Sequence, residues 1–208
     1  MLETINLSKK IKDHLILNDI NITFESGNIY GIVGKNGSGK TMLLRAISGL
    51  IVPTNGEVLV DGKKLHKELS FPPELGILIE KPEFVGYMSG LDNLCLLADI
   101  NKKVTKDEIA SLMKTFDLEP NSKKHVRKYS QGMKQKLGII QAIMENQKII
   151  ILDEPFNALD EQTVRKMHEL LIRFKNEGKL IVITSHHQED IDQFCDYVYK
   201  MDCGCIVQ

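Results

Sequence analysis

The chain has 208 residues, of which 27 are basic and 28 acidic, giving a net charge of −1 at pH 7. Hydrophobic residues make up 42% and charged residues 26%, which excludes a disordered chain and a coiled coil. The balanced charge predicts no nucleic-acid partner, since such proteins carry a basic excess. No apolar run reaches about 18 residues, and the charged start lacks the apolar segment of a secretory signal. The sequence therefore predicts neither a membrane span nor secretion.

The first 25 residues alternate between apolar and polar side chains. Ile20, Ile22 and Phe24 share one face, which is typical of a half-buried antiparallel strand. Val58 and Val60 repeat the pattern further along the chain. We therefore expect an antiparallel β part at the N-terminal end.

Three continuous apolar runs, 29–33, 149–152 and 180–183, differ from this alternation. Such runs suit parallel strands that helices cover on both faces. Apolar residues at helical spacing predict helices over 130–144 and 161–177, and the stretch 91–116 also has a helical pattern. The expected fold class is therefore α/β with a mixed central sheet.

We expect one domain over residues 1–208. Residues 1–84 and 146–208 would form the core with its antiparallel part, and 85–145 would form an inserted helical subdomain. The four cysteines include no Cys-x-x-Cys pair. Cys203 and Cys205 are interpreted as part of a terminal hairpin in a reducing cytosol rather than as metal ligands.

The clearest motif is a phosphate-binding loop of the form G-x-x-x-x-G-K-[ST]. It follows a buried strand and opens a helix, which is the context that such a loop requires. The helix N-terminus and the loop N–H groups attract phosphate, Lys40 reaches the β- and γ-phosphates, and Thr41 ligates Mg²⁺. A dinucleotide fingerprint fits poorly, because its third glycine would fall on Met42. The predicted nucleotide-binding residues here are Gly34, Asn36, Gly37, Ser38, Gly39, Lys40, Thr41 and Met42.

A second part of the site is predicted where the run 149–152 ends in Asp153 and Glu154. Asp153 at the strand end can hold Mg²⁺, and Glu154 can orient or deprotonate the attacking water. A charged strand end is the simpler interpretation of this pair alone. Its combination with the phosphate loop favours nucleotide hydrolysis, and it still leaves kinases, GTPases and motor ATPases open.

The interval between Lys40 and Asp153 is long enough for an inserted domain, and it contains Tyr-Ser-Gln-Gly-Met at 129–133. This segment resembles the Leu-Ser-Gly-Gly-Gln signature of the ATP-binding cassette (ABC) family. Ser130 and Gly132 match the signature, and the other three positions depart from it in a way similar to drug and bacteriocin exporters. Ser130 is also a good N-cap for the helix that follows.

The resemblance extends over nearly the whole chain. Asp160 corresponds to the acidic residue of the family's D-loop, and His186, after the last long strand, corresponds to its γ-phosphate-sensing histidine. The neighbouring His187 is the alternative for that role. His186 fits better, because the acidic residue that follows at the family's spacing is then Asp190.

Two positions depart from the family pattern. The aromatic residue that stacks on adenine corresponds here to Ile11, which predicts a mainly apolar contact with the base. The glutamine at the junction with the helical part corresponds to Glu80. A carboxylate there can approach Mg²⁺, and it adds negative charge beside the phosphates.

The resemblance implies an ATPase subunit, using ATP and Mg²⁺, that powers a membrane exporter of drugs, peptides or bacteriocins. Each ATP would lie between Lys40 of one subunit and Ser130 of a second copy, and closure of this dimer would drive transport. A separate transmembrane permease would hold the subunit at the cytoplasmic face of the membrane, near residues 83–88. The alternatives are a soluble cassette ATPase acting on ribosomes or DNA, and a small-molecule kinase.

Overall fold

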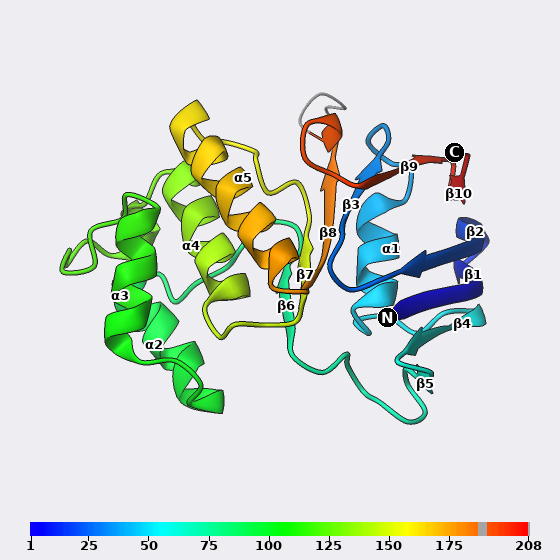
Figure 1. Cartoon of the computed structure of the whole chain (residues 1–208), viewed down its shortest axis with the longest axis horizontal. Helices are drawn as coiled ribbons and strands as arrows, with labels where there is room; N and C mark the ends of the chain where they lie inside the picture. Colours follow the sequence, from blue (N-terminus) through cyan, green and yellow to red (C-terminus); the bar gives the residue numbers. More distant parts are fainter. Residues whose placement is uncertain (187–190, 208) are drawn as a thin grey trace.

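The computed structural model describes residues 1–186 and 191–207. Two β-sheets and a group of helices make up this part of the chain (Figure 1). The strands are β1 (Leu2–Ile11), β2 (His14–Phe24), β3 (Ile29–Val33), β4 (Asn55–Val60), β5 (Lys63–Lys64), β6 (Leu75–Leu78), β7 (Ile149–Leu152), β8 (Leu180–Ser185), β9 (Tyr197–Asp202) and β10 (Cys205–Ile206). The helices are α1 (Lys40–Ile47), α2 (Gly90–Asn101), α3 (Lys106–Thr115), the 3-10 turn η1 (Val126–Lys128), α4 (Gln131–Ile143) and α5 (Glu161–Asn176).

The smaller sheet has the strand order β2-β1-β4-β5 and is antiparallel throughout. Its alternating strands place Ile20, Ile22, Phe24, Val58 and Val60 in the core. Alternation with period two gives each strand one buried face. The predicted N-terminal antiparallel part is therefore confirmed.

The larger sheet has the order β10-β9-β3-β8-β7-β6, and its strands from β9 to β6 are parallel. The three apolar runs form its centre as β3, β8 and β7. Their alternate residues enter two different cores: Ile150 and Leu152 pack with the helices α2 to α5, whereas Ile149 and Ile151 pack with α1. Burial on both faces explains why these strands are continuously apolar.

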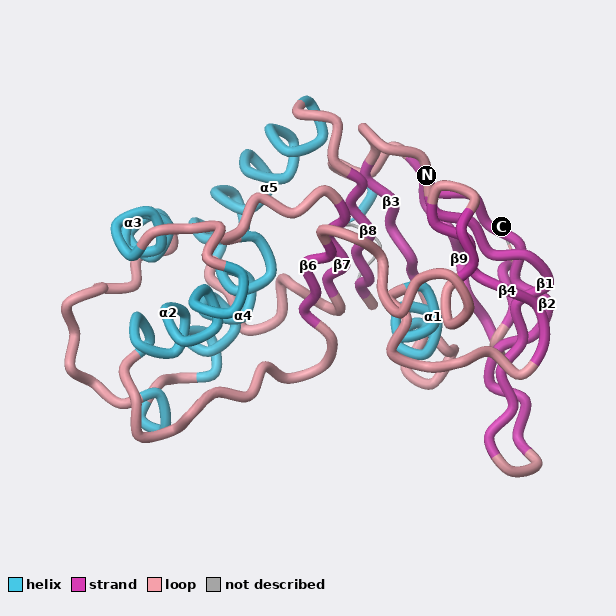
Figure 2. Tube along the Cα trace, turned by 90° about the horizontal axis from the view of Figure 1, so that it is seen from below, coloured by secondary structure: helices cyan, strands magenta, loops and turns pink. Residues whose placement is uncertain are grey.

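Helix α1 lies between the two sheets, and the other helices cover the opposite face of the larger sheet (Figures 1 and 2). The two predicted helices over 130–144 and 161–177 are confirmed as α4 and α5. The helical stretch 91–116 is two helices rather than one. Lys102 adopts a left-handed conformation that ends α2, and Thr105 begins α3 with a capping box.

Helices α2, α3 and α4 all lie between β6 and β7 along the chain, within the range expected for a helical subdomain. The exact division at 85 and 145 stays a prediction. Near the C-terminal end, β9 and β10 pair as the expected hairpin, and all four cysteines are free. Among the described helices, none combines the length and the apolar character needed to cross a membrane.

Candidate nucleotide site

The phosphate loop joins the end of β3 to the start of α1. The N-cap of α1 is Gly39, whose φ of 107° lies in the left-handed region that glycine tolerates and other residues avoid. No side chain caps this helix end. The first N–H groups of a helix have no partner within it, so those of α1 are available to an anion.

Lys40 and Thr41 begin the helix and carry the functional side chains of the loop. Lys40 is buried, and its ammonium donates to the carbonyl of Gly34 at 2.6 Å. The Thr41 hydroxyl donates to Asp153 Oδ2 at 2.7 Å. The loop on β3 and the carboxylate at the end of β7 therefore meet, although they are distant in the sequence.

Asp153 and Glu154 are held by a third strand. The Thr184 hydroxyl on β8 donates to Asp153 Oδ1 at 2.6 Å and accepts the backbone N–H of Glu154 at 2.9 Å. Glu154 lies between two groups: its Oε1 is 3.6 Å from Lys40 Nζ, and its Oε2 is 2.7 Å from His186 Nδ1. The predicted catalytic residues Glu154 and His186 are thus in direct contact. His187, the alternative histidine, and Asp190, which supported the choice of His186, lie outside the described residues.

A cavity of about 430 Å³ lies against the phosphate loop. It is lined by the loop and α1 together with residues of three other segments: Ile16, Lys35, Asn36, Gly37, Gly39, Lys40, Thr41, Met42, Arg45, Glu80 and Glu154. Of the predicted loop residues, Gly34 and Ser38 are absent from this lining, and Ser38 is buried. The wall of the cavity thus combines cationic side chains, carboxylates and the backbone of the glycine-rich loop, as a site for nucleotide phosphates requires.

The residue expected to contact adenine, Ile11, lies at the end of β1 opposite His14 and is 43% exposed. It does not line the cavity, whereas Ile16 on β2 does. Sequence reasoning missed Ile16, because it stands between Leu15 and Leu17 in an apolar stretch of a strand, which gives no signal of ligand contact. The role of Ile11 toward the base stays a prediction.

Glu80 lines the cavity as expected for its position at the junction after β6. Its Oε1 is 2.9 Å from Arg45 on α1, a partner that the sequence did not indicate. Arg45 lies one helical turn after Thr41 and therefore on the same side of α1, a spacing that could have identified it. In this structure Glu80 forms an ion pair within the protein, with its side chain more than half exposed.

The signature-like turn lies at the start of α4. Ser130 is its N-cap, and its hydroxyl accepts the N–H of Met133 at 3.2 Å. A Cβ on Gly132 would lie 2.6 Å from the carbonyl oxygen of Ala158, so only glycine allows this close approach. Neither Ser130 nor Gly132 lines the cavity at the phosphate loop.

Asp160 is the N-cap of α5 and accepts the N–H of Thr163 at 2.8 Å. Hydrogen bonds from the Thr163 backbone and hydroxyl, followed by Lys136, lower the pKa of Asp160 to about 2. Its carboxylate is therefore ionised at neutral pH. A capping role and the predicted D-loop role are compatible, since the Asp160 side chain remains 61% exposed while it caps the helix.

The oxygen atoms of Thr41 and Asp153 suit Mg²⁺, which prefers hydroxyl, carboxylate and phosphate oxygens and retains several waters. No group of three or more His, Cys, Asp or Glu side chains is placed to hold a metal in the described part of the chain. A magnesium ion that arrives with nucleotide phosphates needs only one or two protein ligands. The residues present therefore fit this ion.

A phosphate loop after β3 of a parallel sheet, with a carboxylate pair at the end of β7 on the other side of β8, defines a P-loop nucleotide hydrolase. The family model described as ABC transporter matches residues 17–157. The uncharacterized ABC transporter ATP-binding protein YybJ of Bacillus subtilis is 47% identical over 204 residues, covering 98% of this chain and 94% of YybJ. The bacitracin transport ATP-binding protein BcrA of Enterococcus faecalis is 34% identical over 210 residues, covering 100% of this chain and 68% of BcrA.

Comparison with solved structures leads to the same family as these relatives. The dimeric structure of MJ0796, a bacterial ABC transporter cassette, matches with a TM-score of 0.88 and 26% identity, covering 100% of this chain and 97% of that one. The chain belongs to the ABC transporter family of ATP-binding proteins. The prediction of an ATPase subunit that powers a transporter is confirmed, in preference to a soluble cassette on ribosomes or DNA and to a small-molecule kinase.

Proposed function

We propose that this chain hydrolyses Mg-ATP to drive a membrane exporter of drugs, peptides or bacteriocins. The observation that supports the site best is the contact of Glu154 with both Lys40 and His186, beside the paired Thr41 and Asp153. These five side chains come from three separate segments of the chain. They meet at the helix N-terminus that binds phosphate.

Each of these groups has a proposed task. Lys40 exchanges its contacts with loop carbonyls for the β- and γ-phosphates, and Thr41 and Asp153 hold Mg²⁺, which when bound neutralises phosphate charge. Glu154 accepts a proton from the attacking water, and His186 orients that carboxylate and the γ-phosphate. Glu80 is a further candidate for Mg²⁺ once nucleotide separates it from Arg45.

The dimer is a proposal that follows from the position of Ser130. The exposed Ser130 turn lines no part of this chain's own nucleotide cavity, and the related cassette MJ0796 forms a dimer. We therefore assign Ser130 and Gly132 to the ATP held by a second copy. Asp160, on the neighbouring helix end, belongs to the same interface.

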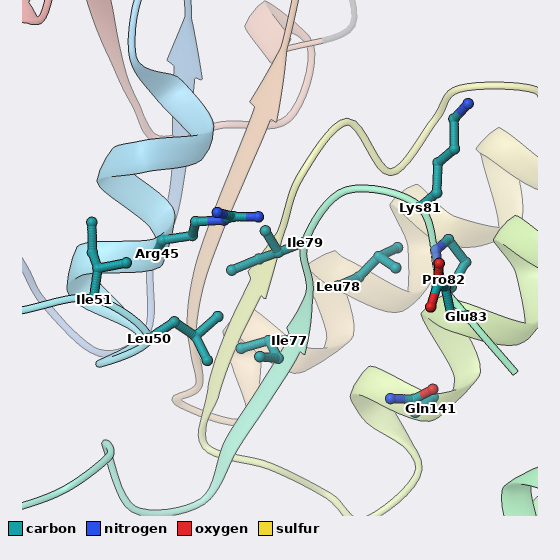
Figure 3. A pocket seen from close by; sticks show the side chains of 11 residues that line it. Arg45, Leu50, Ile51, Ile77, Leu78, Ile79, Lys81, Pro82, Glu83 and Gln141 are labelled. Carbon is teal, nitrogen blue, oxygen red and sulfur yellow. The ribbon is translucent and has the colours of Figure 1, made fainter. Parts of the chain in front are cut away.

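A groove beside the nucleotide cavity is our proposed docking site for a separate permease at the cytoplasmic face. It has a volume of about 430 Å³ and lies between the end of α1, β6 and α4 (Figure 3). Arg45 lines both this groove and the nucleotide cavity, where it pairs with Glu80. Figure 3 shows Arg45 extending from α1 toward Ile79. The groove ends at Glu83, where the expected docking segment 83–88 begins, and Tyr87 in that segment is 73% exposed.

The exporter assignment rests on the form of the signature and on BcrA, a relative whose name assigns it to bacitracin transport. Co-expression with the membrane protein encoded beside this chain, followed by detergent extraction and purification, tests the partnership. We expect a stable complex whose ATPase activity rises when the transported compound is added. Purification of the chain without any membrane protein would contradict the proposal.

A matched pair of variants tests the docking groove in the same purification. Gln141→Arg places a bulky cation in the groove wall and should reduce the recovered permease severalfold. Gln162→Arg makes the same change on an exposed position of α5 and should leave recovery unchanged. Equal recovery with both variants would place the docking site elsewhere.

A further inference from the structure

The backbone of Glu154 is held from two directions by side chains of other elements. Its φ is +48°, in the left-handed region that a non-glycine residue adopts only when its surroundings impose it. Thr184 accepts its N–H, and the side-chain amide of Gln135 donates to its carbonyl oxygen at 3.2 Å. The same amide also donates to the carbonyl oxygen of Pro155 at 3.1 Å. The orientation of the Glu154 side chain therefore depends on Gln135.

Gln135 is 9% exposed and lies on α4, one and a half turns after Ser130. Two further contacts join the start of α4 to the segment 154–160. Gly132 packs against the carbonyl of Ala158, and Lys136 Nζ is 3.3 Å from Asp160 Oδ2. The start of α4 and the segment that carries Glu154 are thus joined at three places, and Gln135 makes the contact at the Glu154 end.

We propose that Gln135 is a positioning residue that holds the Glu154 carboxylate toward the phosphate site and couples it to the signature turn. This inference rests on the proposed function, in which Ser130 contacts the ATP of a second copy and Glu154 acts on this chain's own ATP. A shift of α4 when Ser130 engages nucleotide then changes the backbone of Glu154 through a buried amide. Gln135 thereby links the two ATP sites of the dimer.

The first test removes the amide and keeps its volume. Gln135→Met cannot donate to either carbonyl, so we expect kcat to fall on the order of 10- to 100-fold, because small misplacements of a catalytic group have effects of this size. The dissociation constant for ATP should change less than twofold, since Gln135 does not line the cavity. Gln147→Met, a buried glutamine changed in the same way, is the control and should keep the parent kcat.

A second variant keeps the test informative if the methionine variant does not fold. Gln135→Glu has almost the same shape, but only its protonated carboxyl can donate to the carbonyl of Glu154. Burial beside two carbonyl oxygens raises the pKa of the introduced carboxyl. The ratio of its kcat to the parent kcat should therefore rise severalfold from pH 8.5 to pH 6.5. A side chain with only a structural role would give a ratio independent of pH.

A double-mutant cycle with Ser130→Ala tests the coupling. If Gln135 transmits the engagement of Ser130, Ser130→Ala should lower kcat less in the Gln135→Met background than in the parent. If the loss of kcat in the double variant equals the product of the losses in the two single variants, the link between the sites is overturned. A parent-like kcat for Gln135→Met would overturn the positioning role. Glu154→Gln is measured in parallel. If Glu154→Gln hydrolyses ATP at the parent rate, the proposed function has failed, whereas an inactive Glu154→Gln beside a fully active Gln135→Met rejects only this inference.

Discussion

At the scale of single residues, we expect the charged side chains of the nucleotide cavity to set the affinity for ATP and its dependence on Mg²⁺. Glu80, which the sequence predicts at the position of the family's glutamine, lines the cavity and pairs there with Arg45. The pair is partly exposed, so solvent screens it and its own contribution to stability is small. We expect a larger effect of the pair on ligand binding, because a triphosphate would compete with Glu80 for Arg45.

Glu80→Gln should tighten the binding of metal-free ATP roughly three- to tenfold, because it removes a negative charge near the phosphates and frees Arg45. Binding of Mg-ATP should change little, since Mg²⁺ neutralises the repulsion that the carboxylate causes. The measurement is ATP affinity with and without Mg²⁺ in both proteins. Weaker metal-free binding in the variant would refute the repulsion argument.

Ile11→Tyr tests the predicted contact with adenine. An aromatic ring stacked on the base adds roughly 0.5–1.5 kcal/mol beyond area burial, about tenfold in affinity at most. The gain should appear for ATP and be smaller for inorganic triphosphate, as measured by competition binding. Ile16→Ala provides the comparison, because Ile16 is the apolar residue that lines the cavity, and its truncation should weaken ATP binding. Unchanged affinity of Ile11→Tyr would remove Ile11 from the site.

At the scale of elements, the N-termini of α1 and α4 differ in capping and in position relative to the cavity. The uncapped N-terminus of α1 faces this chain's cavity, whereas the N-terminus of α4 is capped by Ser130 and lies outside it. In the proposed dimer, this difference would separate a residue that binds nucleotide in its own subunit from one that acts on the partner's nucleotide.

Lys40→Ala should therefore abolish ATP binding or turnover in a single subunit, because the phosphates lose their main side-chain partner. Ser130→Ala should leave ATP binding by the monomer within about twofold and impair ATP-driven dimerisation. Loss of its cap would also lower helix stability by about 1 kcal/mol, so Ser130→Gly, which costs only a few tenths of that, controls for stability. Equal loss of monomer affinity in Lys40→Ala and Ser130→Ala would contradict the assignment.

Asp160 at the start of α5 predicts a pH dependence. Its pKa in the folded chain is lowered to about 2, from an ordinary value of 3.8, by the Thr163 hydrogen bonds. A carboxylate with a depressed folded pKa contributes stability above its unfolded pKa, and this stability is lost as pH falls through the interval toward the folded pKa. Asp160→Asn keeps a capping group without the charge, so the parent should unfold at a higher temperature than the variant at pH 6, and the difference should shrink between pH 4 and 2. A constant difference over this range would mean that the carboxylate is not involved.

On the scale of the whole molecule, we expect hydrolysis to control the proposed assembly of two copies. Glu154→Gln should bind Mg-ATP and lose most hydrolysis, since a positioned base contributes on the order of 10²–10⁴-fold. The bound ATP then persists, so a closed dimer should accumulate, as measured by light scattering after size-exclusion chromatography. Lys40→Ala should remain monomeric under the same conditions. Hydrolysis at the parent rate would exclude Glu154 as the base.

Much of this protein followed from its sequence alone. The phosphate loop, the paired carboxylates after β7 and the continuous apolar strands are local patterns, because backbone conformation and burial on both faces impose them on neighbouring residues. These patterns were sufficient for the fold class and the loop, and the family followed from the signature-like segment at 129–133. They concern positions that lie next to one another along the chain.

Contacts between distant segments were decided only by the tertiary structure. Thr184 on β8 orders Asp153 and Glu154, Arg45 pairs with Glu80, and Gln135 reaches the Glu154 backbone from α4. No sequence pattern assigned a role to any of these three residues, since a threonine, an arginine or a glutamine has many structural uses. Their function arises because parallel strands end at the same edge of a sheet and helices pack across it, which brings together side chains that no spacing along the sequence relates.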